Sequence, residues 1–77
     1  MDRLETALIS AHGSGDSNRL AVLYTEAADL AEDAGRIDAA CFYLTHALVF
    51  ALEAGAASAT QLAGRLAAHN RMPAARN

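Results

Sequence analysis

The chain has 77 residues, a formal net charge of −3 and 53% apolar residues, with one cysteine and no tryptophan or lysine. A chain of this length buries only about 60% of the surface that its unfolded form exposes, which excludes a catalytic domain with a second, substrate-holding domain. Alanine supplies 20 residues and leucine 10, both strong helix formers, while residues that favour strands are few. We therefore predict an all-α fold: one small antiparallel bundle of about four helices over residues 1–70, followed by a flexible tail at 71–77.

The first helix is predicted to begin after Asp2. Asp2 and Glu5 have the spacing of a capping box, in which Asp2 accepts from first-turn amides and Glu5 reaches back. Apolar residues then recur at helical spacing at Leu4, Leu8 and Ala11. We expect this helix to end near His12 and residues 13–16 to form a loop, because two of these four residues are glycine.

The second helix is predicted to follow this loop and to end before Gly35, which stands where a left-handed C-terminal cap is expected. Any of three residues suits its N-cap: Ser14, Asp16 or Ser17. Its apolar residues recur every three or four positions: Leu20, Leu23, Ala27, Leu30 or Ala31, and Ala34. Its other face carries polar and acidic residues: Thr25, Glu26, Asp29, Glu32 and Asp33.

The third predicted helix starts at Ile37, closes at Gly55 and is apolar nearly all round. Such a helix usually lies at the centre of a fold, so we expect the second and fourth helices to cover it. Ser58 and Gln61 form a second capping-box pattern at the start of the fourth helix. The apolar stripe of this helix comprises Leu62, Ala63, Leu66 and Ala67.

Residues 21–54 resemble a known helical repeat. The positions that carry the resemblance are Tyr24, Ala28, Gly35, Ala40 and Ala47. An early aromatic residue, small residues and a glycine turn within 34 residues are similar to the tetratricopeptide repeat, a helix–turn–helix unit of that length. The repeat usually has two aromatic residues and a proline where this sequence has Ala31, Leu44 and Leu52. A single repeat cannot bury a continuous core, so the chain must use its flanking helices, dimerise or dock onto another protein.

The resemblance implies a protein–protein interaction module, because the first helix of each such repeat lines the groove that holds the partner. The matching outward positions are Val22, Thr25, Asp29, Glu32 and Asp33. This face is acidic, so we expect a basic or arginine-bearing protein segment as the partner. Charge reversal at Asp29 and Glu32 is expected to abolish binding without unfolding the chain. The same carboxylates are also typical of an ordinary solvated helix face.

The alternative function is self-association as a homodimer without a foreign ligand. Phe42 and Tyr43 lie about 100° apart on a helix. These two residues therefore cannot both face inward together with Tyr24 and Phe50, and some aromatic surface is left for a second copy.

No catalytic, cofactor or metal site is predicted. Cys41 and His46 are five residues apart, on different faces of one helix, so they do not form a metal-binding pair. Cys41 is expected to be buried, which makes a thiol unreactive. Residues 13–15 lack the strand–helix setting of a nucleophile elbow and the lysine of a phosphate-binding loop. We expect a non-enzymatic chain in which His12, His46 and His69 cap carbonyls or face solvent.

Charge and hydropathy also limit which classes of partner and which cellular compartment we expect. The net negative charge and the dispersed arginines disfavour nucleic acid. The longest nearly apolar stretch, residues 39–52, is shorter than the roughly 20 residues of a membrane helix. A single cysteine forms no internal disulfide and no signal peptide is visible, so a cytoplasmic protein is expected. The abundance of alanine and arginine indicates a GC-rich bacterial gene.

Overall fold

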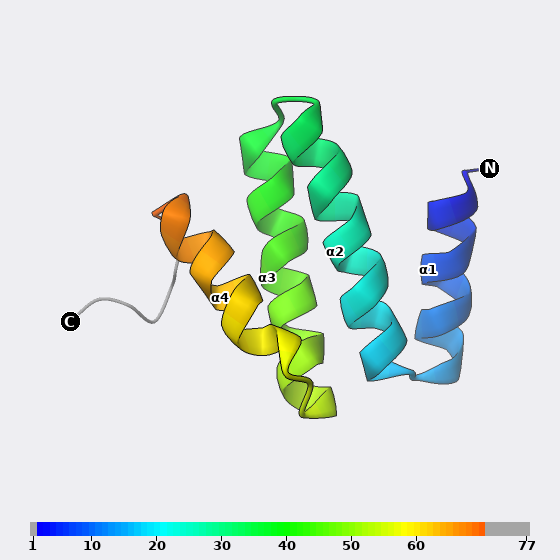
Figure 1. Ribbon diagram of the computed structural model, residues 1–77. Coiled ribbons are helices and arrows are strands. Elements are labelled where there is room, and N and C mark those ends of the chain that lie inside the picture. The colour runs from blue at the N-terminus through cyan, green and yellow to red at the C-terminus, as the bar shows by residue number, and fades with distance from the viewer. Residues whose placement is uncertain (1, 71–77) are drawn as a thin grey trace.

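The computed structural model describes residues 2–70, and this part of the chain is helical, with no strand (Figure 1). Its helices are α1 (Arg3–Ser14), α2 (Ser17–Asp33), α3 (Ile37–Ala54) and α4 (Ser58–Ala68). They form a small antiparallel bundle, which confirms the predicted all-α fold class. The tail predicted at 71–77 lies outside the described residues.

The helices follow one another across the molecule in chain order: α1 packs on α2, α2 on α3, and α3 on α4 (Figure 1). The contact between α2 and α3 is the most extensive. α3 therefore lies between α2 and α4, as its apolar composition predicted. The Cα atoms span 38 × 29 × 16 Å, so the bundle is thin and leaves part of each helix exposed.

Aspartate side chains mark where α1 and α2 begin. The Asp2 carboxylate accepts a hydrogen bond from the Leu4 amide at 3.4 Å. The Asp16 carboxylate accepts from the Arg19 amide at 3.1 Å, so Asp16 is the N-cap among the three candidates for α2. Each of these bonds satisfies an amide that has no partner within its own helix.

α1 ends later than predicted. It includes Gly13 and Ser14, which were expected in a loop, and its C-cap is Gly15 with a left-handed φ of 67°. The Ser14 hydroxyl donates to the Ser10 and Ala11 carbonyls, both at 3.2 Å, and so bonds back into the helix. One glycine in the left-handed region is enough for the turn, which leaves the other glycine free to remain helical.

The tight turn between α2 and α3 depends on Gly35, as predicted. Its φ of 74° is a conformation that glycine adopts at little cost. The Gly35 amide donates to the Glu32 carbonyl at 2.9 Å, and the Arg36 amide donates to the Ala31 carbonyl at 2.8 Å. These two bonds form a Schellman motif, which closes α2 and reverses the chain direction.

The capping box predicted at Ser58 and Gln61 is wrong. The N-cap of α4 is Ala57, which makes no side-chain hydrogen bond and already has helical backbone angles, φ −62° and ψ −24°. Ser58 therefore lies within the first turn and not in the position from which a side chain caps a helix. The helix begins with a backbone bond instead, from the Ala59 amide to the Ala56 carbonyl at 3.2 Å.

Alanines are among the most deeply buried residues of the α2–α3 hairpin. The completely buried alanines there are Ala28, Ala40, Ala47 and Ala51. Because their side chains are single methyl groups, the two helices approach closely. Leu44 on α3 and Leu66 on α4 are the largest fully buried side chains of the described chain, and they fill the space beside these alanines.

A second cluster of buried side chains joins α1 to α2. Its members are Leu4, Ala11, Leu20, Leu23 and Ala27. Tyr24, Tyr43 and Phe50 pack against both this cluster and the α2–α3 core, so three half-buried aromatic rings connect the two parts of the interior.

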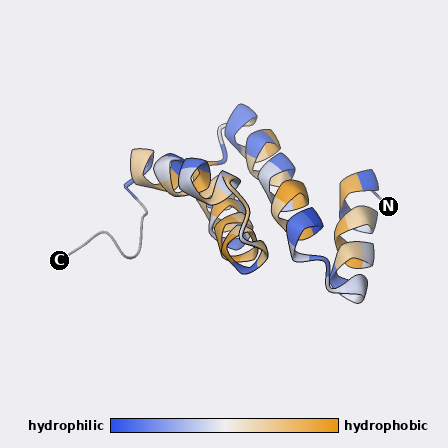
Figure 2. Cartoon of the chain, turned by 60° about the horizontal axis from the view of Figure 1, so that its bottom comes forward, coloured by the Kyte–Doolittle hydropathy of each residue, from blue (hydrophilic) through white to orange (hydrophobic). Residues whose placement is uncertain are grey.

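Many large apolar side chains remain exposed because the bundle is thin. They are Ile9, Val22, Leu30, Ile37, Phe42, Val49 and Leu52. Figure 2 shows that α3 is hydrophobic over most of its length, whereas α2 alternates between hydrophobic and hydrophilic residues. Among the described helices, α3 alone is long and apolar enough to cross a membrane by length and composition, a test that the core helix of a soluble protein also passes.

Candidate functional site

The five residues predicted to bind a partner all lie on α2. Val22, Asp29 and Asp33 are exposed, whereas Thr25 and Glu32 are half-buried. The Thr25 hydroxyl donates to the Ala21 carbonyl at 2.7 Å, within its own helix. That hydroxyl therefore offers a partner its acceptor lone pairs and no free proton.

Two of the predicted carboxylates are paired with α4, which the sequence reasoning did not anticipate. The Arg65 guanidinium lies 2.8 Å from the Asp29 carboxylate and 2.7 Å from the Glu32 carboxylate. Nε2 of His69 lies 2.9 Å from the second oxygen of Glu32. Arg65 and His69 are more than thirty residues away from Glu32 in the chain, so no local spacing indicated these contacts.

These contacts change the titration of both partners. The hydrogen bond from His69 is the main cause that lowers the pKa of Glu32; burial opposes the shift, and Arg65 adds to it. Burial disfavours the charge on Arg65, but hydrogen bonds to Glu32 and Asp29 outweigh it and raise the Arg65 pKa. Glu32 is therefore held as a carboxylate by α4 and serves the fold.

The acidic face of α2 keeps uncommitted charge despite these pairs. Asp33 makes no hydrogen bond or ion pair with the part of the chain that the structure describes. The Asp29 carboxylate is 56% exposed beside its arginine. Glu26, on the same helix, pairs with Arg3 of α1 through a side chain that is 75% exposed. An exposed pair of this kind is weak, so Glu26 remains accessible to a competing cation.

A hollow of about 310 Å³ lies on this acidic face, between α2 and the start of α4. It is lined by Val22, Thr25, Glu26, Asp29 and Ser58. Three of the five predicted residues therefore line one hollow, together with a second carboxylate and a serine from α4. The hollow combines an exposed apolar side chain with two carboxylates, a chemistry suited to an alkyl chain that ends in a cation.

Aromatic rings form a continuous row on the other side of the α2–α3 hairpin. Tyr24 stacks on Phe50 with ring centroids 5.8 Å apart, and its hydroxyl lies 3.0 Å from Nε2 of His12. Tyr24 also contacts the rings of Tyr43 and His46, at 6.3 and 5.2 Å. Two histidines thus flank one tyrosine, an arrangement that the positions of His12 and His46 in the sequence did not indicate.

Phe42 extends this row onto the surface. Its ring lies 4.4 Å from that of His46 and 5.5 Å from that of Tyr43, and the side chain is 57% exposed. Nδ1 of His46 lies 3.1 Å from the Phe42 carbonyl, one turn back in the middle of α3, so this histidine does not cap a helix end. The exposure of the Phe42 side chain agrees with the sequence-based expectation that Phe42 and Tyr43 point in different directions.

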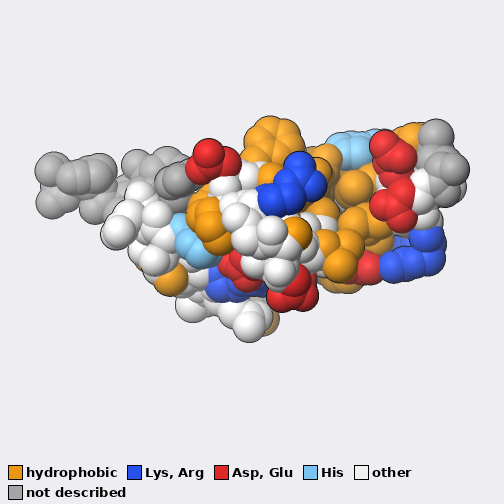
Figure 3. Space-filling model, turned by 90° about the horizontal axis from the view of Figure 1, so that it is seen from above, with side chains coloured by type: hydrophobic (Ala, Val, Ile, Leu, Met, Phe, Trp, Pro, Cys, Tyr) orange, Lys and Arg blue, Asp and Glu red, His pale blue; other side chains and the backbone are white. Residues whose placement is uncertain are grey.

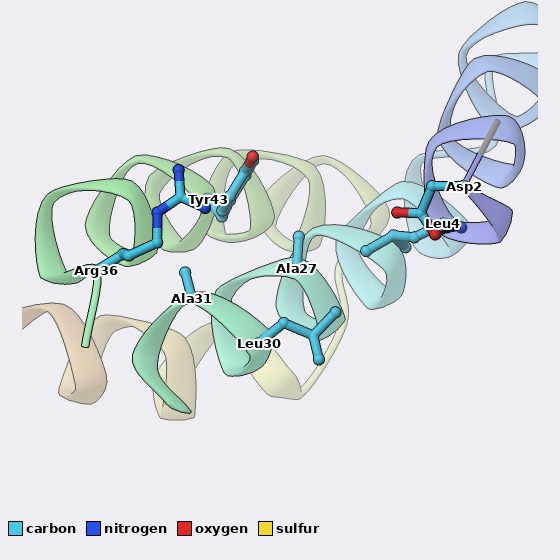
Figure 4. A pocket seen from close by; sticks show the side chains of 7 residues that line it. All are labelled: Asp2, Leu4, Ala27, Leu30, Ala31, Arg36 and Tyr43. Atoms are coloured by element: carbon cyan, nitrogen blue, oxygen red, sulfur yellow. Dashed lines mark hydrogen bonds between the residues drawn. The ribbon is translucent and has the colours of Figure 1, made fainter. Parts of the chain in front are cut away.

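A second hollow, of about 220 Å³, opens at the end of the molecule where α2 turns into α3 (Figure 4). It is lined by Asp2, Leu4, Ala27, Leu30, Ala31, Arg36 and Tyr43, which come from three helices and the residues next to them. Seen from this end, an apolar area of surface extends toward the N-terminus and is bordered by charged side chains (Figure 3). The sequence reasoning did not single out this hollow, because its walls come from segments that are distant in the chain.

The described residues hold no group of three or more histidine, cysteine or acidic side chains that could bind a metal. Cys41 is a free thiol and is buried, as predicted, among the apolar residues of the α2–α3–α4 core. The Ser14 hydroxyl bonds to two backbone carbonyls.

Comparisons of the chain with protein-family models, with curated protein sequences and with solved structures found no match. The assignment of a function therefore depends on the chemistry of the surfaces just described.

Proposed function

We propose that this chain is a non-enzymatic protein–protein interaction module that binds a basic protein segment through the acidic face of α2. The observation that carries the proposal is the hollow lined by Val22, Thr25 and Asp29 with Glu26 and Ser58. It places carboxylates around an apolar side chain on an exposed helix. The methylene groups of an arginine or lysine would pack on Val22 while its cation meets Asp29 or Glu26.

The charges around this hollow favour a cation over an anion. Arg65 neutralises only part of the negative charge, because Asp29, Glu32 and Asp33 are three carboxylates. A basic segment would be attracted to the remaining charge, which mainly raises the association rate and sets the orientation of binding.

We also propose that the α2–α3 hairpin is a tetratricopeptide-like unit, in a cytoplasmic protein of bacterial origin. The small residues of the resemblance, Ala28, Ala40 and Ala47, are completely buried on the two helices. The Gly35 turn supports the same reading, because it reverses the chain within a few residues.

A binding assay with a paired peptide probe tests the proposed partner. The probe is a fluorescein-labelled peptide of about 12 residues that contains arginine and leucine, and its counterpart has glutamate in place of arginine. We expect the Asp29→Asn, Asp33→Asn double variant to bind the arginine peptide about tenfold more weakly, since two exposed charge pairs contribute roughly 0.2–1 kcal/mol each and about 1.4 kcal/mol is a factor of ten. Arg65 keeps its bond to Glu32 in this variant, so α4 remains docked.

The matched control is Glu5→Gln together with Glu53→Gln, which removes the same amount of negative charge elsewhere on the surface. We expect this control to bind the arginine peptide within about twofold of the parent. Equal losses in the two variants would mean that binding follows net charge alone and would refute the acidic-face site.

The second candidate function is self-association through the outer face of α3. The exposed apolar residues Phe42, Val49 and Leu52 support it, because large exposed apolar surface is often an interface. Sedimentation equilibrium over a hundredfold range of concentration distinguishes the two functions. A monomer throughout favours the module, whereas a dimer that the Phe42→Ser variant dissociates favours a structural subunit.

A further inference from the structure

The hollow at the α2–α3 turn is lined by one charge of each sign, Asp2 and Arg36, and only the Arg36 side chain makes no hydrogen bond or ion pair with another described residue. The Asp2 carboxylate on its rim accepts from the Leu4 amide as the N-cap of α1, which holds it at the start of that helix. The Arg36 guanidinium makes no hydrogen bond or ion pair with any described residue, and its side chain does not cap α3. A bound group would therefore meet a free guanidinium that presents five N–H donors.

Tyr43, which also lines this hollow, adds a second hydrogen-bond donor without a partner among the described residues. The Tyr24 hydroxyl is bonded to His12, but the Tyr43 hydroxyl has no hydrogen-bond partner among the described residues. Arg36 and Tyr43 are seven residues apart, so they project from the same side of α3, as Figure 4 shows. The free donors of the hollow thus lie together on one wall.

The rest of the hollow is apolar. Leu4, Ala27 and Ala31 are buried, while Leu30 is 56% exposed at the edge. The Tyr43 ring continues this surface to the exposed ring of Phe42. Aromatic residues and arginine are enriched at the centres of protein interfaces, where a few residues contribute most of the binding energy. This hollow has both, beside exposed apolar side chains.

The size of the hollow indicates what occupies it. Pockets for small molecules and cofactors have volumes of about 300–1,000 Å³. This hollow has about 220 Å³ and is open to the adjoining apolar surface. It therefore suits one or two side chains of a protein segment better than a complete small molecule.

We propose that this hollow is a second binding site, which takes a segment of a partner protein that combines a large apolar side chain with a carboxylate. The apolar side chain packs against Leu30 and the Tyr43 ring, and the carboxylate binds the Arg36 guanidinium. The two groups are complementary in charge, because the guanidinium is a cation and the carboxylate an anion. They also match in geometry, because they form two parallel hydrogen bonds. The site shares no lining residue with the hollow on the acidic face of α2 and prefers the opposite charge.

The proposal is tested by fluorescence polarisation with a labelled amphipathic peptide of about 12 residues. The probe carries leucine and phenylalanine at helical spacing with glutamate between them, and a counterpart carries lysine in place of glutamate. We expect the glutamate peptide to bind at least about tenfold more tightly than the lysine peptide at this site. Arg36→Glu is expected to remove most of this binding, and the neutral Arg36→Gln to weaken it about tenfold.

Arg19→Glu is the matched control, because it makes the same charge change at another exposed arginine. We expect it to leave the affinity for the glutamate peptide within about twofold. Leu30→Ser removes an exposed side chain of the hollow without opening the core, and we expect it to weaken binding several-fold. Circular dichroism melting confirms that each variant is folded.

Three results of the peptide assay would overturn the proposal: no binding of the glutamate peptide at about 1 mM, equal losses for Arg36→Glu and Arg19→Glu, or unchanged binding in Leu30→Ser. Sedimentation of the peptide-free protein detects the other possible occupant, a second copy of this chain. A dimer that Arg36→Glu dissociates would assign the hollow to self-association and refute the partner-segment site. The outcome is independent of the acidic-face site, which is tested by Asp29 and Asp33 variants.

Discussion

Arg65 joins α4 to α2, and its removal should destabilise the chain measurably. Arg65→Met keeps most of the aliphatic length of the side chain but deletes both ion pairs. The bond to Glu32 is the stronger one, because the two side chains are only 24% and 29% exposed, whereas Asp29 is 56% exposed. A charge-assisted hydrogen bond contributes roughly 1.5–3 kcal/mol when buried, and an exposed pair about 0.2–1 kcal/mol. Partial exposure places the expected loss at about 1–2 kcal/mol.

That loss is large for a chain of this size. Domains have stabilities of roughly 0.05–0.15 kcal/mol per residue, and 1 kcal/mol shifts the melting temperature of a small domain by about 4–8 °C. Urea titration followed by circular dichroism measures the free energy of unfolding, and calorimetry measures the melting temperature. We expect a decrease of roughly 5–15 °C for Arg65→Met.

A double-mutant cycle identifies the source of this loss. Glu32→Gln is combined with Arg65→Met, and the coupling energy is expected to be about 1 kcal/mol. Arg19→Met is the control, because Arg19 lies at the start of α2 and takes no part in an ion pair of the described chain. If Arg65→Met changes the unfolding free energy by less than about 0.3 kcal/mol, the α2–α4 ion pairs do not stabilise the fold.

Two further predictions concern pH and backbone conformation. The pKa of Glu32 is lower in the folded chain than its ordinary value of about 4.3, so its carboxylate stabilises the fold above that pH, and this contribution is lost as the pH falls through the folded pKa. We expect Glu32→Gln to be less stable than the parent at pH 7 and to lose less stability on acidification to pH 3; equal acid losses would show that Glu32 is not involved. Gly64→Ala places a methyl group in open space on α4 and should stabilise the chain by about 0.5–1 kcal/mol, whereas Gly35→Ala forces alanine to a φ of 74° and should destabilise it by about 1–2 kcal/mol. Chemical denaturation of the two variants measures both effects, and changes of the same sign would contradict the reasoning.

The structure also revises one expectation about the acidic face. Charge reversal at Asp29 and Glu32 was expected to leave the fold intact. Both carboxylates bind Arg65. The charge-reversed variant would therefore place positive side chains beside Arg65 and remove the ion pairs that join α4 to α2. Asp33, which has no such contact, is the better position for testing partner binding.

Local signals in the sequence account for most of the helix boundaries. Asp2 and Asp16 cap the first two helices, and Gly35 and Gly55 end α2 and α3 in the left-handed conformation, because each effect involves residues within one turn of one another. The prediction failed at Ser58, where backbone geometry at the preceding residue had already started the helix. A sequence pattern shows that a cap is possible, but the angle at which the chain enters the helix decides whether it forms.

The sequence by itself determined that the fold is all-α and that α3 is the central helix, since propensity and periodicity act locally. Only the tertiary structure decided which charges remain available to a partner. Arg65 and His69 approach Glu32 from a distant part of the chain, and the Arg36 side chain is left without a partner among residues 2–70, in a hollow whose lining comes from three helices and the residues next to them. The pairing of a charged side chain depends on its distance in space from residues on other helices, and that distance is fixed only when the helices pack.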